Sequence, residues 1–420
     1  MGLFPSLMTL SGTFVSAVTL MVYTAFVYKF GISAVWIFIG YILGFLLFIP
    51  FAVKLYRLSV QHQFFTMTDY FVFRYGRKTA RIIIGVVFLW YVGLLSTQFL
   101  AGSNLLNELG GIPVAIAKVT MLLVVLTYLL VGGFGSVVKT DVFQFIVIFL
   151  VLFLVGMTVQ RGADIPKEMY DPFNAGPDMI AAFLILGILT PFATQDYWQK
   201  VFAMKNEQVV KRSFSLGAVM IILITLPLTY VGLIARANFP PEIPEYANGG
   251  AELMVLHTFT DLVPPEFQLF VLIAFFAAIL STSDTYLFLL ALNVTNDLFP
   301  TEKKSEKQEV NRIRKALIVV GILALLIALF FLHIEDIVVA FKALGIGIAP
   351  VIFYDWAGRR DKRSVTVALV TTAIVTMTVS TYMLLQHGQV DPGLGFVSVG
   401  VCSLTYFFTY QWGKKKKSLS

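Results

Sequence analysis

The chain has 420 residues, of which 58% are hydrophobic and only 13% are charged. This composition excludes an ordinary soluble domain, and repeated apolar runs of about 20 residues indicate membrane-spanning helices. The net charge of +7 does not require a nucleic-acid partner. Membrane orientation and attraction to anionic lipid explain it more simply.

The apolar runs predict an all-α polytopic membrane protein with about 12 transmembrane helices. The expected spans are roughly residues 5–28, 32–55, 80–106, 112–132, 137–160, 178–197, 213–236, 267–298, 315–333, 337–356, 364–385 and 392–412. If both termini are cytoplasmic, 25 of the 31 lysines and arginines fall in or beside inner loops. The positive-inside rule therefore predicts a plasma (inner) membrane protein with cytoplasmic termini. The oligomeric state stays open.

The first and sixth spans carry signals for a broken helix. Gly12 lies among serines and threonines, so we expect the first span to unwind there and to expose carbonyls that can bind a cation. Alternatively, Gly12 only permits close helix packing, as we expect of Gly40 in the second span. Pro191, preceded by Thr190, interrupts the sixth span.

Broken helices in matching positions indicate inverted repeats around a site near the membrane midplane. We therefore expect a first five-helix repeat at 1–160 and a second at 161–360. Two accessory helices and a basic cytoplasmic tail would follow at 361–420. The basic, aromatic 56–80 loop should form an interfacial helix, and the 237–266 loop should lie outside.

The eighth span contains the stretch 271–297, which has a dense polar run near its middle. Its residues Ala278, Ser281, Thr282 and Thr285 share one helix face, and Asp284 adds a carboxylate that is costly inside a membrane. Oxygen ligands of this kind suit a hard cation such as sodium. In the alternative interpretation the hydroxyls bond back to carbonyls one turn earlier, and Asp284 pairs with a basic side chain.

Three other spans carry isolated polar residues. Asp141 is a second carboxylate, at the inner start of the fifth span, and its alternative role is a salt bridge with Lys139. Tyr91 and Gln98 share a face of the third span, where they could line a solute pathway or bond neighbouring helices. Lys342, near the end of the tenth span, is expected to snorkel to the interface, with recognition of an anionic solute as the alternative.

Several stretches resemble the sodium/solute symporter family, which has the leucine-transporter-like inverted-repeat fold. The resemblance extends to about residue 360 and rests on TLSGTFVSAVTLM and GISAVW in the first 80 residues, GGFGSVVKTDVFQ before the fifth span, TQDYWQKVFAMKNEQVVKRS after the sixth, and AAILSTSDTYLFLLALNVTNDLF in the eighth. Most members begin with an extra helix before the broken one, which this chain lacks, so its N-terminus is expected inside.

The resemblance implies sites for sodium and for solute. The family's common sodium site falls on Gly12, Val15, Ala278, Ser281 and Thr282. Some members have a second sodium site, which falls here on Asp141, Asp284 and Thr285 together with Ser281. In this chain the same residues could alternatively bind a proton. Asp284 stands where several members have Ser or Thr, a variant shared by a subset of the family. Matching positions and helix faces give the solute-site candidates Ser16, Thr19, Tyr91, Gln98, Phe192, Thr194 and Gln195.

The function that follows is secondary active transport, not enzyme catalysis. Sodium is the expected coupling ion for inward symport of a small polar organic solute by alternating access. Two alternatives stay open. The protein could be a membrane solute sensor, or it could couple transport to protons through Asp284 or Asp141.

Overall fold

The computed structural model describes residues 1–16, 18–132, 137–159, 164–242, 250–299 and 305–418, and some side chains inside helices, including all of 137–145, fall outside the description. Every element assigned in these residues is helical, which confirms the all-α prediction. The first part contains α1 Leu3–Phe14, the π-helix η1 Val18–Tyr23, α2 Thr24–Phe30, the 3-10 helix η2 Gly31–Val35, α3 Trp36–His62, α4 Met67–Gly110, α5 Val114–Gly132 and α6 Val137–Thr158.

The second part begins with the short 3-10 helix η4. It contains η4 Lys167–Tyr170, α7 Gly176–Ala193, α8 Gln195–Ala203, α9 Glu207–Asn238, α11 Gly250–Asp261, α12 Pro265–Leu292, the π-helix η5 Asn293–Leu298, α13 Glu306–Phe330, α14 Ile334–Ile346, α15 Ala349–Trp356, α16 Lys362–His387 and α17 Leu394–Ser418. Helices occupy all twelve expected spans.

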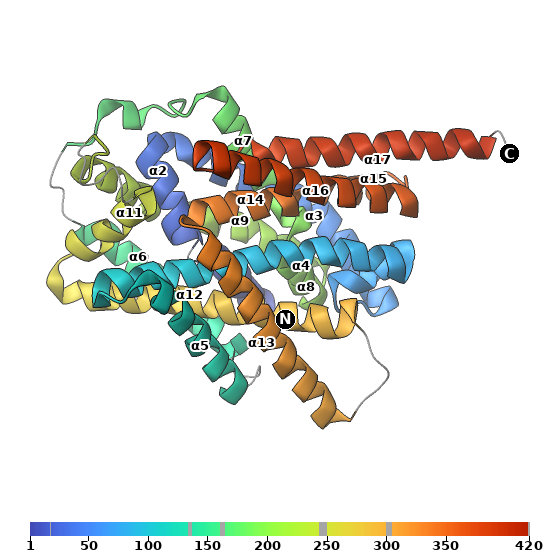
Figure 1. Ribbon diagram of the computed structural model, residues 1–420, viewed down its shortest axis with the longest axis horizontal. Coiled ribbons are helices and arrows are strands. Elements are labelled where there is room, and N and C mark those ends of the chain that lie inside the picture. Colours follow the sequence, from blue (N-terminus) through green and yellow to red (C-terminus); the bar gives the residue numbers. More distant parts are fainter. Residues whose placement is uncertain (17, 133–136, 160–163, 243–249, 300–304, 419–420) are drawn as a thin grey trace.

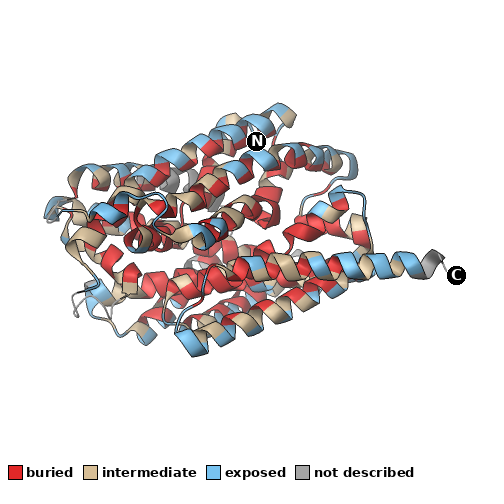
Figure 2. Ribbon diagram, turned by 90° about the horizontal axis from the view of Figure 1, so that it is seen from above, coloured by how far each residue is buried: buried red, intermediate tan, exposed pale blue. Residues whose placement is uncertain are grey.

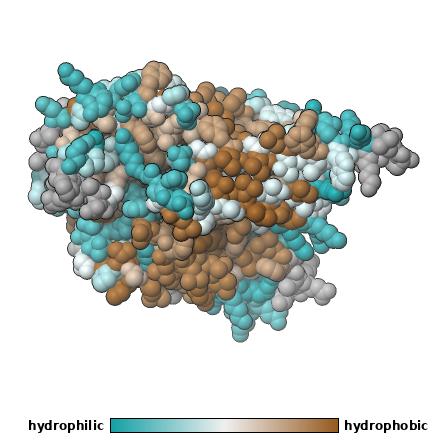
Figure 3. Space-filling model, turned by 45° about the horizontal axis from the view of Figure 1, so that its top comes forward, coloured by the Kyte–Doolittle hydropathy of each residue, from teal (hydrophilic) through white to brown (hydrophobic). Residues whose placement is uncertain are grey.

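Most long helices run along the longest axis of the molecule, while α5 and α13 cross them obliquely (Figure 1). Among the described residues, eight segments are long and apolar enough to cross a membrane, and two shorter apolar helices lie at Val114–Thr127 and Ile148–Thr158. Hydrophobic side chains gather in a broad region between hydrophilic ends (Figure 3). The molecule is therefore an integral membrane protein, and the total of 12 spans stays a prediction.

The bundle buries the faces where helices meet, whereas its outer faces are exposed (Figure 2). Large apolar side chains such as Leu47, Leu226 and Leu326 are more than half exposed. Exposed apolar side chains in such numbers would make a soluble protein aggregate, but they suit contact with lipid chains.

Of the 56–80 stretch, expected to form an interfacial helix, residues 56–62 end α3 and residues 67–76 form the first part of α4. Thr66 and Asp69 make a capping box in which the Thr66 hydroxyl accepts from the Asp69 amide and the Asp69 carboxylate accepts from the Thr66 amide. Gly76 then interrupts the helix with a φ of 76°, a left-handed conformation that glycine adopts without strain. A short basic and aromatic segment therefore precedes the membrane-spanning part of α4.

Glycines permit the close packing of α3 against α7. A Cβ atom on Gly40 would lie 2.8 Å from the Leu184 carbonyl oxygen, and one on Gly187 would lie 2.4 Å from the Ile37 carbonyl oxygen. Backbone atoms cannot move aside as a flexible side chain can, so only glycine fits at these two positions. The close-packing prediction for Gly40 is confirmed, and α3 and α7 hold each other at nearly backbone-to-backbone contact.

Candidate functional site

The first expected break lies at Val15 and Ser16, three residues after the predicted Gly12. Helix α1 ends at Phe14, and Val15 has extended torsion angles. Gly12 stays helical because the Val15 amide still donates to the Ser11 carbonyl. Among the described residues, no backbone amide donates to the carbonyls of Gly12 or Val15. Within the described part of the chain, the break therefore leaves two carbonyl oxygens without a backbone partner, as a cation site requires.

The second expected break separates α7 from α8 at Thr194, which has a ψ of 113°. Local polar groups satisfy the carbonyls around it. The Thr194 hydroxyl donates to the Thr190 carbonyl at 2.7 Å, and the Trp198 indole N–H donates to the Phe192 carbonyl at 2.7 Å. Pro191 lies in the last turn before this break, where a missing N–H weakens the helix.

A cavity lies between the two breaks and contains about 920 Å³ of atom-free space, including its opening. Its walls come from α1, η1, α2, α3, α4, α7, α8, α12 and α14. Aromatic rings and hydroxyls dominate the lining, and one wall is the T-shaped pair of Tyr91 and Tyr286, with ring centroids 5.3 Å apart. A largely apolar cavity with a few polar groups is the usual form of a small-molecule site.

Four predicted solute-site residues line this cavity. They are Ser16, Thr19, Tyr91 and Thr194. Ser16 lies at the first break and Thr19 follows it, and the Thr19 hydroxyl donates to the Phe14 carbonyl. Thr194 lies at the second break, and Tyr91 accepts a hydrogen bond from the Asp196 amide at 3.3 Å. The discontinuous helices thus supply polar groups to one cavity from both breaks.

The other three candidates, Phe192, Gln98 and Gln195, do not line this cavity, and their part in a solute site stays a prediction. Phe192 packs between aromatic rings, with its ring centroid 5.3 Å from that of Phe48 and 4.9 Å from that of Phe353. Gln98 is fully buried within the bundle, and its amide donates to Thr97. Helix rotation, which sequence alone does not fix, turns these side chains away.

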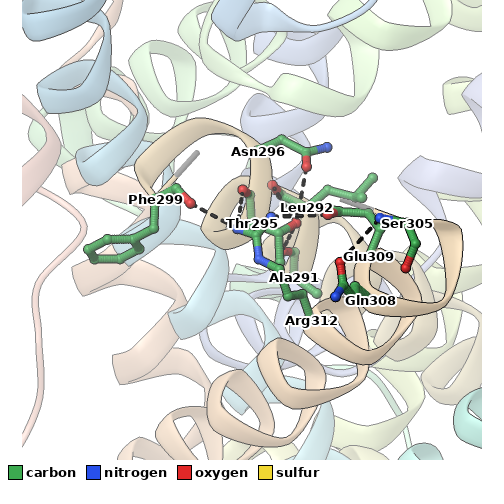
Figure 4. Close-up of polar contacts among 9 residues, drawn as sticks. All are labelled: Ala291, Leu292, Thr295, Asn296, Phe299, Ser305, Gln308, Glu309 and Arg312. Carbon is green, nitrogen blue, oxygen red and sulfur yellow. Dashed lines mark hydrogen bonds and ion pairs between the residues drawn. The ribbon is translucent and has the colours of Figure 1, made fainter. Parts of the chain in front are cut away.

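Gln195 instead forms two hydrogen bonds with Asn293. The Gln195 amide donates to the Asn293 side-chain oxygen at 3.1 Å, and the Asn293 amide donates to the Gln195 oxygen at 3.2 Å. Both residues are buried, so the pair joins α8 to η5 away from water. Arg312 of α13 holds the far end of η5, because its guanidinium donates to the Thr295 carbonyl at 2.8 Å and to the Phe299 carbonyl at 2.9 Å (Figure 4).

Lys342 lines the cavity, so the expectation that it snorkels to the interface is wrong. It belongs to α14, which packs mainly against α4 and α17. Its ammonium donates to the Tyr41 hydroxyl of α3 and lies 4.7 Å from the Tyr41 ring centroid. The sequence signal was a lone lysine in an apolar stretch, and Tyr41 itself was missed because tyrosines are common throughout the chain.

The hydroxyls of α12 do bond back along their own helix. The Thr282 hydroxyl donates to the Ala278 carbonyl at 2.9 Å, and the Thr285 hydroxyl donates to the Ser281 carbonyl at 3.0 Å. These bonds use the proton of each hydroxyl and leave its oxygen lone pairs available. Back-bonding and cation binding are therefore compatible for Thr282 and Thr285, which are partly exposed, as is Ser281.

The helices that carry the predicted ion ligands are linked through α6. Helix α1 packs mainly against α9 and α6, while α12 packs mainly against α6 and α4. The side chain of Asp141, on α6, lies outside the described residues. Asp284 is buried on α12, and its carboxylate lies 3.3 Å from the Thr285 hydroxyl, whose single proton it shares with the Ser281 carbonyl. Both predicted ion sites thus involve helices that contact α6.

Comparison with known proteins agrees with this architecture of two broken helices around a cavity. A Na⁺-coupled sialic acid symporter in a substrate-bound outward-open state superposes with a TM-score of 0.73 at 16% identity, and the match covers 98% of this chain and 90% of that one. A nucleobase-cation-symport-1 family transporter in a closed conformation with bromovinylhydantoin bound gives a TM-score of 0.60 at 14% identity, covering 98% and 93%. The protein thus has the leucine-transporter-like fold.

The sequence places the chain within a family. Residues 1–355 match the model of the sodium:solute symporter family, so the chain belongs to that family. Sodium/proline symporter 2 of Staphylococcus saprophyticus is 23% identical over 323 residues, which cover 72% of this chain and 61% of that protein. The sodium/pantothenate symporter of Escherichia coli K12 is 23% identical over 351 residues, which cover 76% of this chain and 70% of that protein.

Proposed function

We propose that the protein is a secondary active transporter that couples sodium to the inward symport of a small organic solute. Family membership together with the cavity between the two breaks supports this function. In this proposal residues 1–160 and 161–360 are the two inverted repeats, and 361–420 adds the accessory helices and tail.

Sodium would bind to the carbonyls of Gly12 and Val15 and to the α12 face that carries Ala278, Ser281 and Thr282. Oxygen ligands of both kinds suit a hard cation. Because these groups lie on separate helices, sodium would favour the state in which α1 approaches α12. The solute cavity begins at the same break, so sodium and solute would each raise the affinity for the other.

Orientation follows from the distribution of basic residues. The protein would lie in the plasma (inner) membrane with cytoplasmic termini, because 25 of 31 lysines and arginines then fall on the inner side. A cysteine introduced at Ala247, in the loop expected outside, should react with a membrane-impermeant reagent in intact cells. A protected cysteine would reverse this orientation.

Ser281→Ala and Thr282→Ala test the sodium site. Each removes one neutral oxygen, and a lost polar contact costs about 1–3 kcal/mol, so the sodium concentration for half-maximal uptake should rise roughly 5- to 150-fold. Solute affinity at low sodium should fall as well and recover at high sodium. Uptake into proteoliposomes at varied sodium measures both effects.

Ser283→Ala is the matched control. Its hydroxyl donates to the Ile279 carbonyl at 2.6 Å, but the residue is fully buried and lies off the predicted ligand face. Its sodium curve should equal that of the unmodified protein. Unchanged sodium curves in both Ser281→Ala and Thr282→Ala would refute the ion site. Uptake that needs a pH gradient but no sodium would favour proton coupling instead.

A further inference from the structure

Lys342 is the only charged residue among the described residues that line the central cavity. The neighbouring polar groups are the hydroxyls of serine, threonine and tyrosine side chains, and the remainder of the lining is mostly aliphatic or aromatic. No aspartate or glutamate belongs to this described lining. Within the described lining, a single ammonium group therefore carries the only formal charge.

An ammonium group in such a place is costly unless an anion compensates it. Its contacts here are the Tyr41 hydroxyl and the face of the Tyr41 ring, 4.7 Å away. Both contacts orient the ammonium, but neither neutralises its charge. Lysine carries three donors, so its geometry leaves capacity for an acceptor from within the cavity.

The remaining walls indicate what kind of anion fits. Phe14, Phe38 and Tyr23 form a continuous ring cluster, in which Phe38 lies 5.1 Å from Phe14 and 4.0 Å from Tyr23 between ring centroids. All three line the cavity with Lys342. Such walls bury apolar surface. A small inorganic anion would leave them unused, whereas an organic anion with an apolar body would contact both the ammonium and the rings.

We propose that Lys342 binds the carboxylate of the transported solute, so that the cavity selects organic monocarboxylates over their neutral counterparts. This inference rests on the proposed transport function and names its substrate class. The Tyr41 hydroxyl positions the ammonium and offers a second donor to the carboxylate. A monocarboxylate is specified because the described lining contains one positive charge and no negative charge that would hold a cationic group.

The same contacts connect the carboxylate site to the first helix break. The Tyr41 ring packs edge-on against Phe14, with centroids 5.3 Å apart and an interplanar angle of 84°. Phe14 is the last residue of α1, directly before Val15. A carboxylate that fixes Lys342 and Tyr41 thus supports the end of α1, where the sodium site begins.

Thermal stability of the full chain in detergent, with sodium or choline as the cation, tests the proposal. The probes are matched pairs: benzoate with benzamide, hexanoate with hexanamide, and pantothenate with pantothenol, with proline as a zwitterion. We expect at least one carboxylate to raise the melting temperature while its neutral partner does not. In Lys342→Gln the affinity for that carboxylate should fall roughly 30-fold or more, as for one truncated partner of a buried charge pair.

Three variants separate charge recognition from folding. Lys342→Arg should keep the preference for carboxylates, because it keeps the charge. Tyr41→Phe keeps the ring and removes the hydroxyl, so the preference should weaken less than in Lys342→Gln. Lys118→Gln is the matched control, since Lys118 is buried on α5, outside the cavity lining, where its ammonium lies 3.5 Å from the Phe331 carbonyl oxygen. It should not change the selectivity ratio.

Two results would overturn the assignment of Lys342. One is a panel in which no carboxylate stabilises the protein or in which neutral partners stabilise it equally. The other is an unchanged carboxylate preference in Lys342→Gln. Carboxylate binding that ignores sodium would refute the proposed coupling while the role of Lys342 stands, so the two failures are distinguishable.

Discussion

Replacing Asn293 by leucine removes half of the buried amide pair that joins α8 to the end of α12. The two hydrogen bonds of this pair measure 3.1 and 3.2 Å, and each residue is 1% exposed. Asn293→Leu leaves both the oxygen and the N–H of Gln195 without this partner. An unsatisfied buried group costs about 1–3 kcal/mol, so we expect the free energy of unfolding to fall by about 2–4 kcal/mol.

The double variant Gln195→Met/Asn293→Leu should recover much of this loss. Replacing both partners by apolar side chains of similar shape leaves no orphaned polar group and can be nearly neutral. The losses of unfolding free energy in Gln195→Met and Asn293→Leu should therefore add up to more than the loss in the double variant, with a coupling energy of about 1–3 kcal/mol. Equilibrium unfolding in mixed detergent micelles of the unmodified chain, the two single variants and the double variant measures these free energies.

Two outcomes would refute the reasoning. If the single losses simply add in the double variant, the two amides do not interact, and the pair geometry is wrong. If Asn293→Leu alone is as stable as the unmodified chain, the site is hydrated and not dry. Gln195→Met should also leave the selectivity between carboxylates and neutral solutes intact, since Gln195 does not line the cavity.

Gly187→Ala should lower the free energy of unfolding by about 1–3 kcal/mol, because its Cβ would lie 2.4 Å from the Ile37 carbonyl oxygen. Gly85→Ala, whose Cβ would have nothing within 4 Å, should be neutral or stabilising. Equal thermal stability of the two variants would contradict this packing. Contact with the Glu252 carboxylate raises the pKa of His333, so protonated His333 stabilises the fold below about pH 6.5, and this contribution is lost as the pH rises through the raised pKa. His333→Gln should flatten the pH dependence of the melting temperature above about pH 6, and an unaltered profile would exclude that role.

Sequence alone placed the helices well because each span is a long apolar run that must satisfy its own backbone in lipid. It also found both interrupted spans, since Pro191 and the cluster around Gly12 weaken helices locally. The actual break at Val15 depends on hydrogen bonds such as that of Val15 to Ser11, which composition does not determine. Local sequence therefore marks a weak region more reliably than the residue at which it opens.

Side-chain roles were harder to predict because they depend on how each helix is rotated in the bundle. Gln195 and Thr194 are neighbours in the sequence, yet Thr194 lines the cavity and Gln195 faces Asn293. Lys342 has the composition of a residue that reaches the interface, but α14 turns it toward Tyr41. Only the partners across the bundle distinguish these possibilities.

The glycine contact between α3 and α7 limits how the protein can move. Helices that meet at backbone distance through Gly40 and Gly187 cannot slide or separate without losing that contact, so we expect them to move as one body. Tyr41 belongs to that body, whereas Lys342 belongs to α14, which packs mainly on α4 and α17. Motion of α14 relative to α3 would therefore stretch the hydrogen bond from Lys342 to Tyr41, and a solute that holds both side chains would resist that motion.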